Sequence, residues 1–299
     1  MTDRCNLNCS YCAPGRLRVM SGRSDLLSYE EITAIVTMAA ELGVTKVRVT
    51  GGEPLARRGV GTLLTALSGI DGIATLGLTT NGTLLERHIP GIIATRFRRL
   101  NVSLDTLDHD RYRSLCGFDG LPRVLAGIRS ALDAGLRLKL NAVCWPGFRI
   151  SDALDLSAFG LERGMDVRFI GAMRVRGAGR VREGILDDVQ EAIGSRWSLV
   201  PDGRRGSANL FRVEGSTGRI GIIAPSSSGF CEGCGRIRLS STGLLRSCLF
   251  SRGGVDIREA ARQGNRSAIK AALESIIFNK EAASGREGGV VQTMMGIGG

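Results

Sequence analysis

The feature that most constrains the fold is a regular alternation of β-branched segments with amphipathic ones. Segments typical of strands begin near residues 45, 73, 98, 137 and 165, and segments with helical periodicity separate them. This alternation predicts βαβ units, in which helices connect the parallel strands of one sheet. Five or more such units favour an α/β fold, a partial (β/α) TIM-type barrel of parallel strands, over a doubly wound sheet.

Local signals predict where several elements begin and end. Ser28 and Glu31 form a capping box ahead of a helix that ends at Gly43. The βα rhythm stops beyond Gly177, and two further helices are expected at 255–262 and 266–277. We therefore expect two regions: residues 1–176 form the partial barrel, and residues 177–299 form a C-terminal extension.

Polar and glycine-rich motifs follow four of the expected strands. They are Gly51-Gly52-Glu53-Pro54, Thr79-Thr80-Asn81-Gly82, Ser103 with Asp105, and Gly171-Ala172-Met173. In a barrel of this kind the active site lies at the C-terminal ends of the strands. These motifs supply more ligand-type groups than the turns themselves need, so we expect them to line a site.

Two groups of three cysteines predict metal chemistry. The first triplet is Cys5, Cys9 and Cys12, and the second triplet is Cys231, Cys234 and Cys248. Structural zinc sites are closed by four ligands, whereas soft thiolates also select iron–sulfur clusters. The economical interpretation is two clusters, each with one open position. One zinc site that takes four ligands from both triplets is the alternative.

The remaining metal-ligating residues do not complete either triplet. His88 and His109 are the only histidines, and both lie far from the triplets in sequence. Cys116 and Cys144 are interpreted as small buried hydrophobic residues. Because the chain shows neither an export signal nor a long apolar run, its eight cysteines predict a reducing compartment, the cytoplasm, and no membrane span.

The net charge of +11 leaves three interpretations. A nucleic-acid partner usually requires a clustered basic stripe or a known module, and the arginines here are scattered, so nucleic acid is not favoured. An anionic small molecule such as a nucleotide is the second interpretation. An arginine-rich composition without a special partner is the third.

The motifs together resemble a known family. With Tyr11 before its last cysteine, the first triplet resembles the cluster-binding signature of radical S-adenosylmethionine enzymes. Gly51-Gly52-Glu53-Pro54 is similar to that superfamily's motif for the amino group of the cofactor. The second triplet, with Arg236 and Arg238 inside it, and the terminal Gly298-Gly299 narrow the resemblance to the GTP 3′,8-cyclase family of molybdenum cofactor biosynthesis. The resemblance extends over the chain from Thr2.

The resemblance implies a role for each motif. The first triplet would hold a 4Fe–4S cluster that generates a 5′-deoxyadenosyl radical from S-adenosylmethionine, and the second would hold a 4Fe–4S cluster that faces guanine. The radical would remove the ribose 3′ hydrogen, and the resulting carbon radical would attack C8. The implied cofactor contacts are Tyr11, Gly52, Glu53, Ser103 and Met173. The implied GTP contacts are Arg48, Thr79, Lys139, Arg236, Ile237 and Arg238. The implied catalytic residues are Cys5, Cys9, Cys12, Arg236 and Arg238.

The cations within strands are informative without any resemblance. Arg48 and Lys139 each lie in an apolar strand, where an unpaired charge that points inward is costly. Each side chain therefore either extends outward past the helices or points into the barrel at an anion. Arginine suits bidentate contacts with phosphate, and no P-loop motif is present to bind phosphate by another route.

The sequence departs from the family pattern at three places. Ala13 stands where methionine is usual, and Gly171-Ala172-Met173 stands where Glu-Phe-Met is common. The strand expected before Cys5 is largely missing, together with an arginine that contacts GTP in the family. The family's C-terminal tail, which here ends in Gly298-Gly299, is expected to reach the active site.

The resemblance also implies partners, and two rival functions stay open. The partners are a downstream cyclic pyranopterin monophosphate synthase and a reductant such as flavodoxin or ferredoxin. A homodimer is one assembly consistent with the resemblance. The first rival is another radical S-adenosylmethionine enzyme with an auxiliary cluster, of the peptide maturase type. The second is a basic nucleic-acid-binding protein stabilised by zinc.

Overall fold

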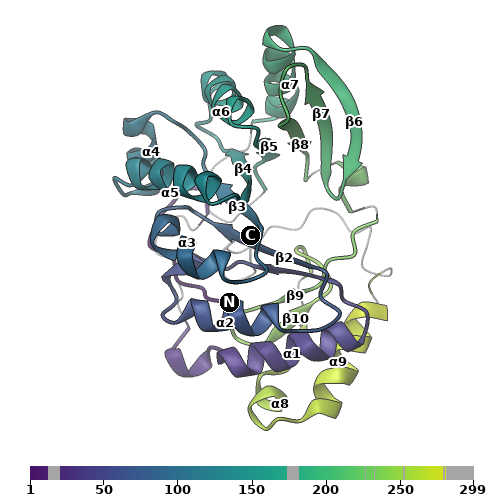
Figure 1. Ribbon diagram of the computed structural model, residues 1–299. Coiled ribbons are helices and arrows are strands. Elements are labelled where there is room, and N and C mark those ends of the chain that lie inside the picture. Colours follow the sequence, from purple (N-terminus) through teal and green to yellow (C-terminus); the bar gives the residue numbers. More distant parts are fainter. Residues whose placement is uncertain are drawn as a thin grey trace.

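The computed structural model describes residues 1–12, 21–173, 182–225, 227–231, 233–251, 253–278 and 280. This part of the chain is built on an eight-stranded sheet with the order β1-β2-β3-β4-β5-β8-β7-β6 (Figure 1). The strands are β1 (Lys46–Val49), β2 (Thr75–Thr80), β3 (Arg99–Ser103), β4 (Arg137–Cys144), β5 (Asp166–Gly171), β6 (Leu199–Arg205), β7 (Ala208–Val213) and β8 (Arg219–Ile223). Strands β1 to β5 and β8 are parallel, and β7 and β6 extend the sheet as antiparallel strands.

Helices connect the parallel strands and share one core with the buried face of the sheet. They are α1 (Tyr29–Glu41), α2 (Val60–Ser68), α3 (Leu85–Ile93), α4 (His109–Cys116), α5 (Leu121–Asp133), α6 (Ile150–Glu162) and α7 (Ile185–Arg196). Short 3-10 turns are η1 (Arg23–Asp25), η2 (Pro54–Ala56) and η3 (Ser228–Cys231). In β4, alternate residues such as Leu138 and Leu140 are buried in this core, while Lys139 and Asn141 are only half-buried. Burial of one such leucine contributes about 1.5–3 kcal/mol.

The expected α/β architecture is confirmed. The expected strands appear as β1 to β5, and the helix predicted from the Ser28–Glu31 capping box begins at Tyr29 with both hydrogen bonds of the box formed. The parallel sheet also continues past residue 176, because β8 pairs with the far edge of β5. Helix α7 and the hairpin of β6 and β7 separate β5 from β8 in the sequence, so a local sequence pattern does not reveal that the two strands pair.

A second, smaller sheet lies in the C-terminal part of the chain. It has the order β11-β10-β9, and its strands are β9 (Arg238–Leu239), β10 (Leu244–Arg246) and β11 (Val255–Asp256). The helix expected at 255–262 is therefore shorter than predicted, because Val255 and Asp256 pair with β10 and only α8 (Arg258–Arg262) is helical. Helix α9 (Arg266–Phe278) confirms the last expected helix and packs with α8 against α1 (Figure 1).

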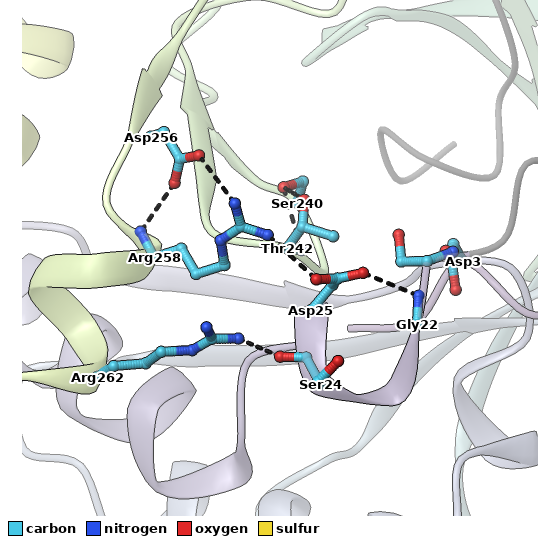
Figure 2. A network of polar contacts seen from close by, with 10 residues as sticks. Asp3, Gly22, Ser24, Asp25, Ser240, Thr242, Asp256, Arg258 and Arg262 are labelled. Atoms are coloured by element: carbon cyan, nitrogen blue, oxygen red, sulfur yellow. Dashed lines mark hydrogen bonds and ion pairs between the residues drawn. The ribbon is translucent and has the colours of Figure 1, made fainter.

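Polar contacts join this C-terminal part to the segment around η1, as Figure 2 shows. Arg258 forms an ion pair with Asp25 at 3.5 Å, and Arg262 donates to the carbonyl oxygen of Ser24. The N–H of Leu27 donates to the carbonyl oxygen of Ser241 at 2.9 Å. Since the ion pair is partly exposed, it contributes at most about 1 kcal/mol, and the contacts serve mainly to orient the two parts.

None of the described helices combines the length and the apolar character that a membrane span requires.

Candidate active site

Backbone contacts hold the loop of the first triplet at the carboxyl end of β1. The N–H groups of Gly52 and Glu53 donate to the carbonyl oxygens of Thr2 and Arg4, both at 2.7 Å. A Cβ atom at Gly52 would lie 2.2 Å from the carbonyl oxygen of Arg4. The glycine of the strand-end motif is therefore required by the close approach of the cysteine loop.

The other side of the same loop contacts the C-terminal end of α4. The N–H groups of Asn8 and Ser10 donate to the carbonyl oxygens of Cys116 and Leu115 at 2.8 and 3.1 Å. Cys116 is buried, as predicted, and its Sγ lies 3.7 Å from the Sγ of Cys9. A hydrogen bond with this neighbouring thiol, together with burial, raises the pKa of Cys9 well above its ordinary value.

The residues of the first triplet fit a cluster of soft metal ions. All three are half-buried thiols, and none of them forms a disulfide. The sulfur of Cys5 accepts from the backbone N–H of Leu7 at 3.4 Å and from the side-chain amide of Asn81 at 3.7 Å. Donors of this kind stabilise metal-bound thiolates. Among the described residues, no group of three or more cysteine, histidine, aspartate or glutamate side chains is placed to hold a single metal ion.

Tyr11, the residue before the last cysteine of the first triplet, is fixed by a buried carboxylate. Its hydroxyl donates to Asp105 at 2.7 Å, and the N–H of Val143 donates to the other oxygen of Asp105 at 2.7 Å. Burial raises the pKa of Asp105 to about 6, although both hydrogen bonds act in the opposite direction. Asp105, singled out at a strand end by the sequence, thus ties the loop to β3 and β4.

Glu53 is fully buried and joins the loops that follow β1 and β2. One carboxylate oxygen accepts from the N–H of Leu55 at 3.0 Å and the hydroxyl of Thr80 at 2.8 Å, and the other accepts from the N–H of Asn81 at 2.7 Å. Burial raises the pKa of Glu53 to about 7. Leu55, Thr80 and Asn81 thus already donate to the Glu53 side chain in this structure. Gly52, the residue before it, can offer a ligand only its backbone groups.

One face of the sheet carries the polar residues that the sequence singled out. Residues paired across neighbouring parallel strands lie side by side on the same face. The register pairs Arg48 with Gly77. It also pairs Asn101 with both Thr79 and Lys139, and Asn141 with both Ser103 and Arg168. The expected substrate contacts Arg48, Thr79 and Lys139 and the expected cofactor contact Ser103 therefore share the face opposite the helix-covered core.

Like charges gather on this face. Desolvation and the positive charges of Arg168 and Arg236 lower the pKa of Arg48. Burial lowers the pKa of Lys139, with Arg168 and Arg48 adding to the effect, while an ion pair with Asp166 at 2.7 Å opposes it. The buried Nε of Arg168 has no hydrogen-bond partner among the described residues. An anion is the ligand that such an arrangement accommodates.

Arg168 is a candidate site residue that the sequence interpretation did not include. It lies in β5, where Val167 and Phe169 are buried while Asp166 and Arg168 are half-buried. The alternation of charged and apolar residues in this segment was the available signal. Only the register with Asn141 shows which face it lines.

The second triplet lies on the turns around β9 and β10. Its cysteines are free, half-buried thiols, and their mutual charges contribute to the raised pKa of Cys231, whose largest cause is burial. Cys234 differs, because hydrogen bonds and positive charge from Arg236, together with the charge of Lys280, outweigh desolvation and lower its pKa. Phe230 and Phe250 make an edge-to-face contact at 6.3 Å beside the triplet. These soft donors also fit a cluster.

Arg236 and Arg238 connect the second triplet with the cationic face of the sheet. Arg236 interacts electrostatically with Cys234 on one side and with Arg48 and Arg168 on the other. Burial and then Arg236 lower the pKa of Arg238, which also interacts with Cys248 and Cys234. The charged residues among the expected substrate contacts, on the sheet and beside the second triplet, therefore belong to one electrostatic group.

For the remaining predicted residues within the described ranges, the structure gives a position or burial but no polar contact with the site. Ile237 packs against the main core, and Met173 follows the end of β5 and is half-buried. Gly171 ends β5, and a Cβ atom there would lie 3.2 Å from side-chain atoms of Leu186 and Pro225. Ala13 and the tail with Gly298 and Gly299 lie outside the described residues.

Two family models and several curated relatives match the sequence of this chain. Residues 1–159 match the Radical SAM superfamily, and residues 165–285 match Molybdenum Cofactor Synthesis C. A GTP 3′,8-cyclase of Moorella thermoacetica is 39% identical over 272 residues, which cover 88% of this chain and 84% of that protein. A GTP 3′,8-cyclase of Peptoclostridium acidaminophilum is 35% identical over 100% of this chain and 94% of its own length.

A solved structure shows the same fold. The crystal structure of Streptococcus suis SuiB bound to S-adenosylmethionine superposes with a TM-score of 0.67 at 17% identity, over 92% of this chain and 65% of the other. The sequence relationships are much closer than this structural one and cover both cysteine triplets. The chain therefore belongs to the radical SAM superfamily and, within it, to the family of GTP 3′,8-cyclases.

Proposed function

We propose that this chain cyclises GTP to 3′,8-cyclo-7,8-dihydro-GTP, the first step of molybdenum cofactor biosynthesis. The observation that carries the proposal is the group of Arg48, Lys139, Arg168, Arg236 and Arg238, whose interactions link the sheet to the second triplet. Such a group suits a triphosphate, since charge-assisted hydrogen bonds from arginine to phosphate are among the strong ones. Relatives named GTP 3′,8-cyclase support the same substrate.

Membership of the radical SAM superfamily implies one 4Fe–4S cluster and S-adenosylmethionine. The residues that would hold this cluster are Cys5, Cys9 and Cys12. When bound, the cluster and the cofactor would supply a 5′-deoxyadenosyl radical, the hydrogen-abstracting species that cyclisation of GTP requires. The residues assigned to the cofactor are Tyr11, Gly52, Glu53, Ser103 and Met173.

Within this proposal, Tyr11 and Glu53 act mainly through the loops that they fix. Asp105 holds the Tyr11 hydroxyl, and Glu53 holds the N–H of Asn81, so both orient the wall of the cofactor site. Gly52 keeps the backbone close to the cysteine loop. These groups limit the freedom of the reacting atoms, and orientation of this kind supplies a large share of catalysis.

The second triplet, Cys231, Cys234 and Cys248, would hold a second 4Fe–4S cluster at the guanine end of the substrate. Arg236, Ile237 and Arg238 follow Cys234 after one glycine, so this segment would contact both the cluster and the nucleotide. Thr79 and Lys139 would contact GTP from the sheet. We propose that the two regions, 1–176 and 177–299, act as the two walls of one reaction chamber.

The proposal extends to the reaction's surroundings. None of the eight cysteines, all of which lie in the described part of the chain, forms a disulfide, which suits a reducing compartment such as the cytoplasm. The electron for the cluster would come from a small redox protein such as flavodoxin or ferredoxin, and a cyclic pyranopterin monophosphate synthase would take the product. A homodimer is the assembly that we would test first.

The decisive experiment follows deuterium from GTP labelled at the ribose 3′ position. After anaerobic reconstitution, we expect 5′-deoxyadenosine that carries one deuterium and forms only when GTP is present. Arg168→Ala should weaken GTP binding, whereas Arg129→Ala, on an exposed position of α5, should leave it unchanged. Formation of 5′-deoxyadenosine without deuterium transfer would favour another radical SAM reaction, such as peptide maturation, and would refute the cyclase proposal.

A further inference from the structure

The side chain of Asn81 contacts a predicted cluster ligand, although neither the motif nor the resemblance gives it a role. Asn81 follows the end of β2 and is half-buried. Its amide Nδ2 lies 3.7 Å from the Sγ of Cys5 and 2.9 Å from the Oδ1 of Asn6. These contacts connect two segments separated by more than seventy positions along the chain.

The surrounding hydrogen bonds decide which end of the amide faces the sulfur. The Oδ1 of Asn81 accepts from the N–H of Thr83 at 3.0 Å and from the Thr83 hydroxyl at 2.6 Å. An amide oxygen accepts and an amide nitrogen donates, so these two donors direct Nδ2 toward Cys5. The backbone N–H of Asn81 donates to buried Glu53 at 2.7 Å, which fixes the position of the residue itself.

The Cys5 sulfur therefore receives two N–H donors, one from Asn81 and one from the backbone of Leu7 at 3.4 Å. The side-chain contact of the Cys9 sulfur is different, because there the neighbour is the thiol of Cys116 at 3.7 Å. A neutral N–H donor stabilises negative charge on sulfur without adding a net charge to the site. Hydrogen bonds to the sulfurs are one of the determinants of the reduction potential of an iron–sulfur cluster.

We propose that Asn81 is a positioning residue for the first cluster, and that its Nδ2–H···Sγ hydrogen bond to Cys5 raises the reduction potential of that cluster. The inference rests on the proposed role of Cys5 as a cluster ligand. An added electron increases the negative charge on the cluster and its thiolates. The donor consequently stabilises the reduced state more than the oxidised one, and its loss should make reduction harder.

A purely structural role for Asn81 is the competing explanation. Its Oδ1 closes a turn by accepting from the N–H of Thr83, next to Gly82, whose φ of +81° favours glycine. Aspartate forms the same turn with the same acceptor atom. The substitution Asn81→Asp therefore preserves the turn and removes the donor, but it also adds a negative charge beside Cys5. Serine offers the turn a neutral acceptor, so Asn81→Ser removes the amide donor without that charge, and the two variants together separate the two roles.

The test is a redox titration followed by electron paramagnetic resonance on the anaerobically reconstituted protein. The signal that changes when S-adenosylmethionine is added reports the first triplet. We expect Asn81→Asp and Asn81→Ser to lower its midpoint potential, with at least a several-fold loss in the reduction equilibrium; tenfold corresponds to 59 mV for one electron. Thermal stability of Asn81→Ser should stay close to that of Asn6→Ala, because both variants lose the hydrogen bond between Asn81 and Asn6.

Two control variants sharpen this test. Asn6→Ala removes the contact between the loops but keeps the donor on Cys5, so its midpoint potential should not change. Asn265→Asp makes the same chemical change at the exposed start of α9, where the side-chain oxygen accepts from Ala268 at 3.1 Å and aspartate can do the same. It controls for a general effect of changing an amide to a carboxylate, while the neutral variant Asn81→Ser controls for the charge placed beside Cys5.

Each outcome decides the question. An unchanged midpoint potential in either Asn81 variant overturns the proposal, and so does an equal shift in Asn6→Ala. Loss of the signal from both Asn81 variants, with Asn6→Ala unaffected, supports a donor that the cluster requires. If the unchanged protein shows no signal that responds to S-adenosylmethionine, the assignment of the first triplet fails instead, independently of Asn81.

Discussion

The two cysteine triplets have the same donor atoms, but the chain holds them differently. Segments far apart in sequence position the first triplet: the loops after β1, β2 and β3 and the end of α4 all contribute hydrogen bonds. The second triplet is held locally, around η3 and the β9–β10 hairpin. The first site therefore depends on the folded barrel, and the second depends on its own turns and on charge.

The thiol pKa values express this difference. Burial raises the pKa of Cys5 even though Leu7 and Asn81 donate hydrogen bonds to it. Desolvation acts in the same direction on Cys234, but Arg236 and Lys280 outweigh it and lower the pKa. The donors to Cys5 are thus neutral, whereas at Cys234 positive charges act together with hydrogen bonds. Because Arg236 also acts on Arg48 and Arg168, the second triplet shares its charges with the proposed triphosphate site.

The largest expected effect comes from removing one thiol of each triplet. Cys9→Ala should abolish 5′-deoxyadenosine formation altogether, because the cofactor would lose its cluster. Cys234→Ala should retain the first cluster and some cofactor cleavage but lose GTP-dependent cyclisation. Iron content, 5′-deoxyadenosine and cyclised nucleotide are measured for both variants. Equal loss of cofactor cleavage in the two variants would contradict separate roles for the triplets.

The next largest effect tests how the barrel anchors the first triplet. Asp105→Ala leaves the buried N–H of Val143 and the hydroxyl of Tyr11 without their acceptor. Each orphaned group costs about 1–3 kcal/mol, so we expect the iron-free chain to lose about 2–4 kcal/mol of unfolding free energy in urea. Asp105→Asn can still accept from Val143 and donate to Tyr11, and it serves as the matched variant. An equal loss in both variants would show that charge, rather than the anchor, matters.

A smaller effect should appear in the pH dependence of stability. The pKa of Glu53 is about 7 in the folded chain against an ordinary value of 4.5, so the folded state binds the proton more tightly. Stability should therefore fall as the pH rises from about 4.5 to about 7 and become constant above that range. Asp105, with a pKa of about 6, adds the same trend at lower pH.

Glu53→Gln provides the control for this trend. Between pH 6 and 7 Glu53 is the main contributor of the pair, so the variant should lose the slope in that interval while the slope below pH 6 persists. Glutamine also turns an N–H group toward the N–H of Asn81, so a lower overall stability is expected as well. Urea midpoints of the iron-free chain at several pH values give the answer, and an unchanged slope between pH 6 and 7 would contradict the assignment.

The contrast between the triplets also explains what could be predicted from sequence. Local chemistry predicted the capping box at Ser28, the strand rhythm up to β5, and the buried state of Cys116 and Cys144. It did not predict that β8 lies beside β5, because α7 and the hairpin of β6 and β7 separate these strands in the sequence. It also did not predict that Val255 pairs with β10, because this pairing depends on how the intervening turn folds.

The same limit applies to the candidate site. Strand ends identified the polar motifs, yet Arg168 was missed because sequence alone does not say which face of β5 lines the interior. The contact between Asn81 and Cys5 was likewise hidden, since it depends on how two distant loops meet. Residue types and spacing thus predicted which kinds of donor the site contains. Which residues lie beside those donors could be seen only in the folded structure.

The smallest expected effect is a few-fold difference in thiol reactivity within the iron-free chain. The thiolate is the nucleophile, so Cys234, with its lowered pKa, should react with iodoacetamide at pH 7 before Cys5, whose pKa is raised. Limited labelling followed by peptide mass spectrometry measures both rates.

Lys280→Met should slow the labelling of Cys234, because the charge of Lys280 contributes to the lowered pKa and its amino group also donates to the carbonyl oxygen of Arg236. Lys270→Met, on an exposed position of α9, should not change the rate. The rate at Cys5 should be the same in both variants, since neutral donors surround that sulfur. A parallel change at Cys5 would mean that the charge of Lys280 acts on both triplets. The proposed difference, in which charge acts on the second triplet but not on the first, would then be wrong.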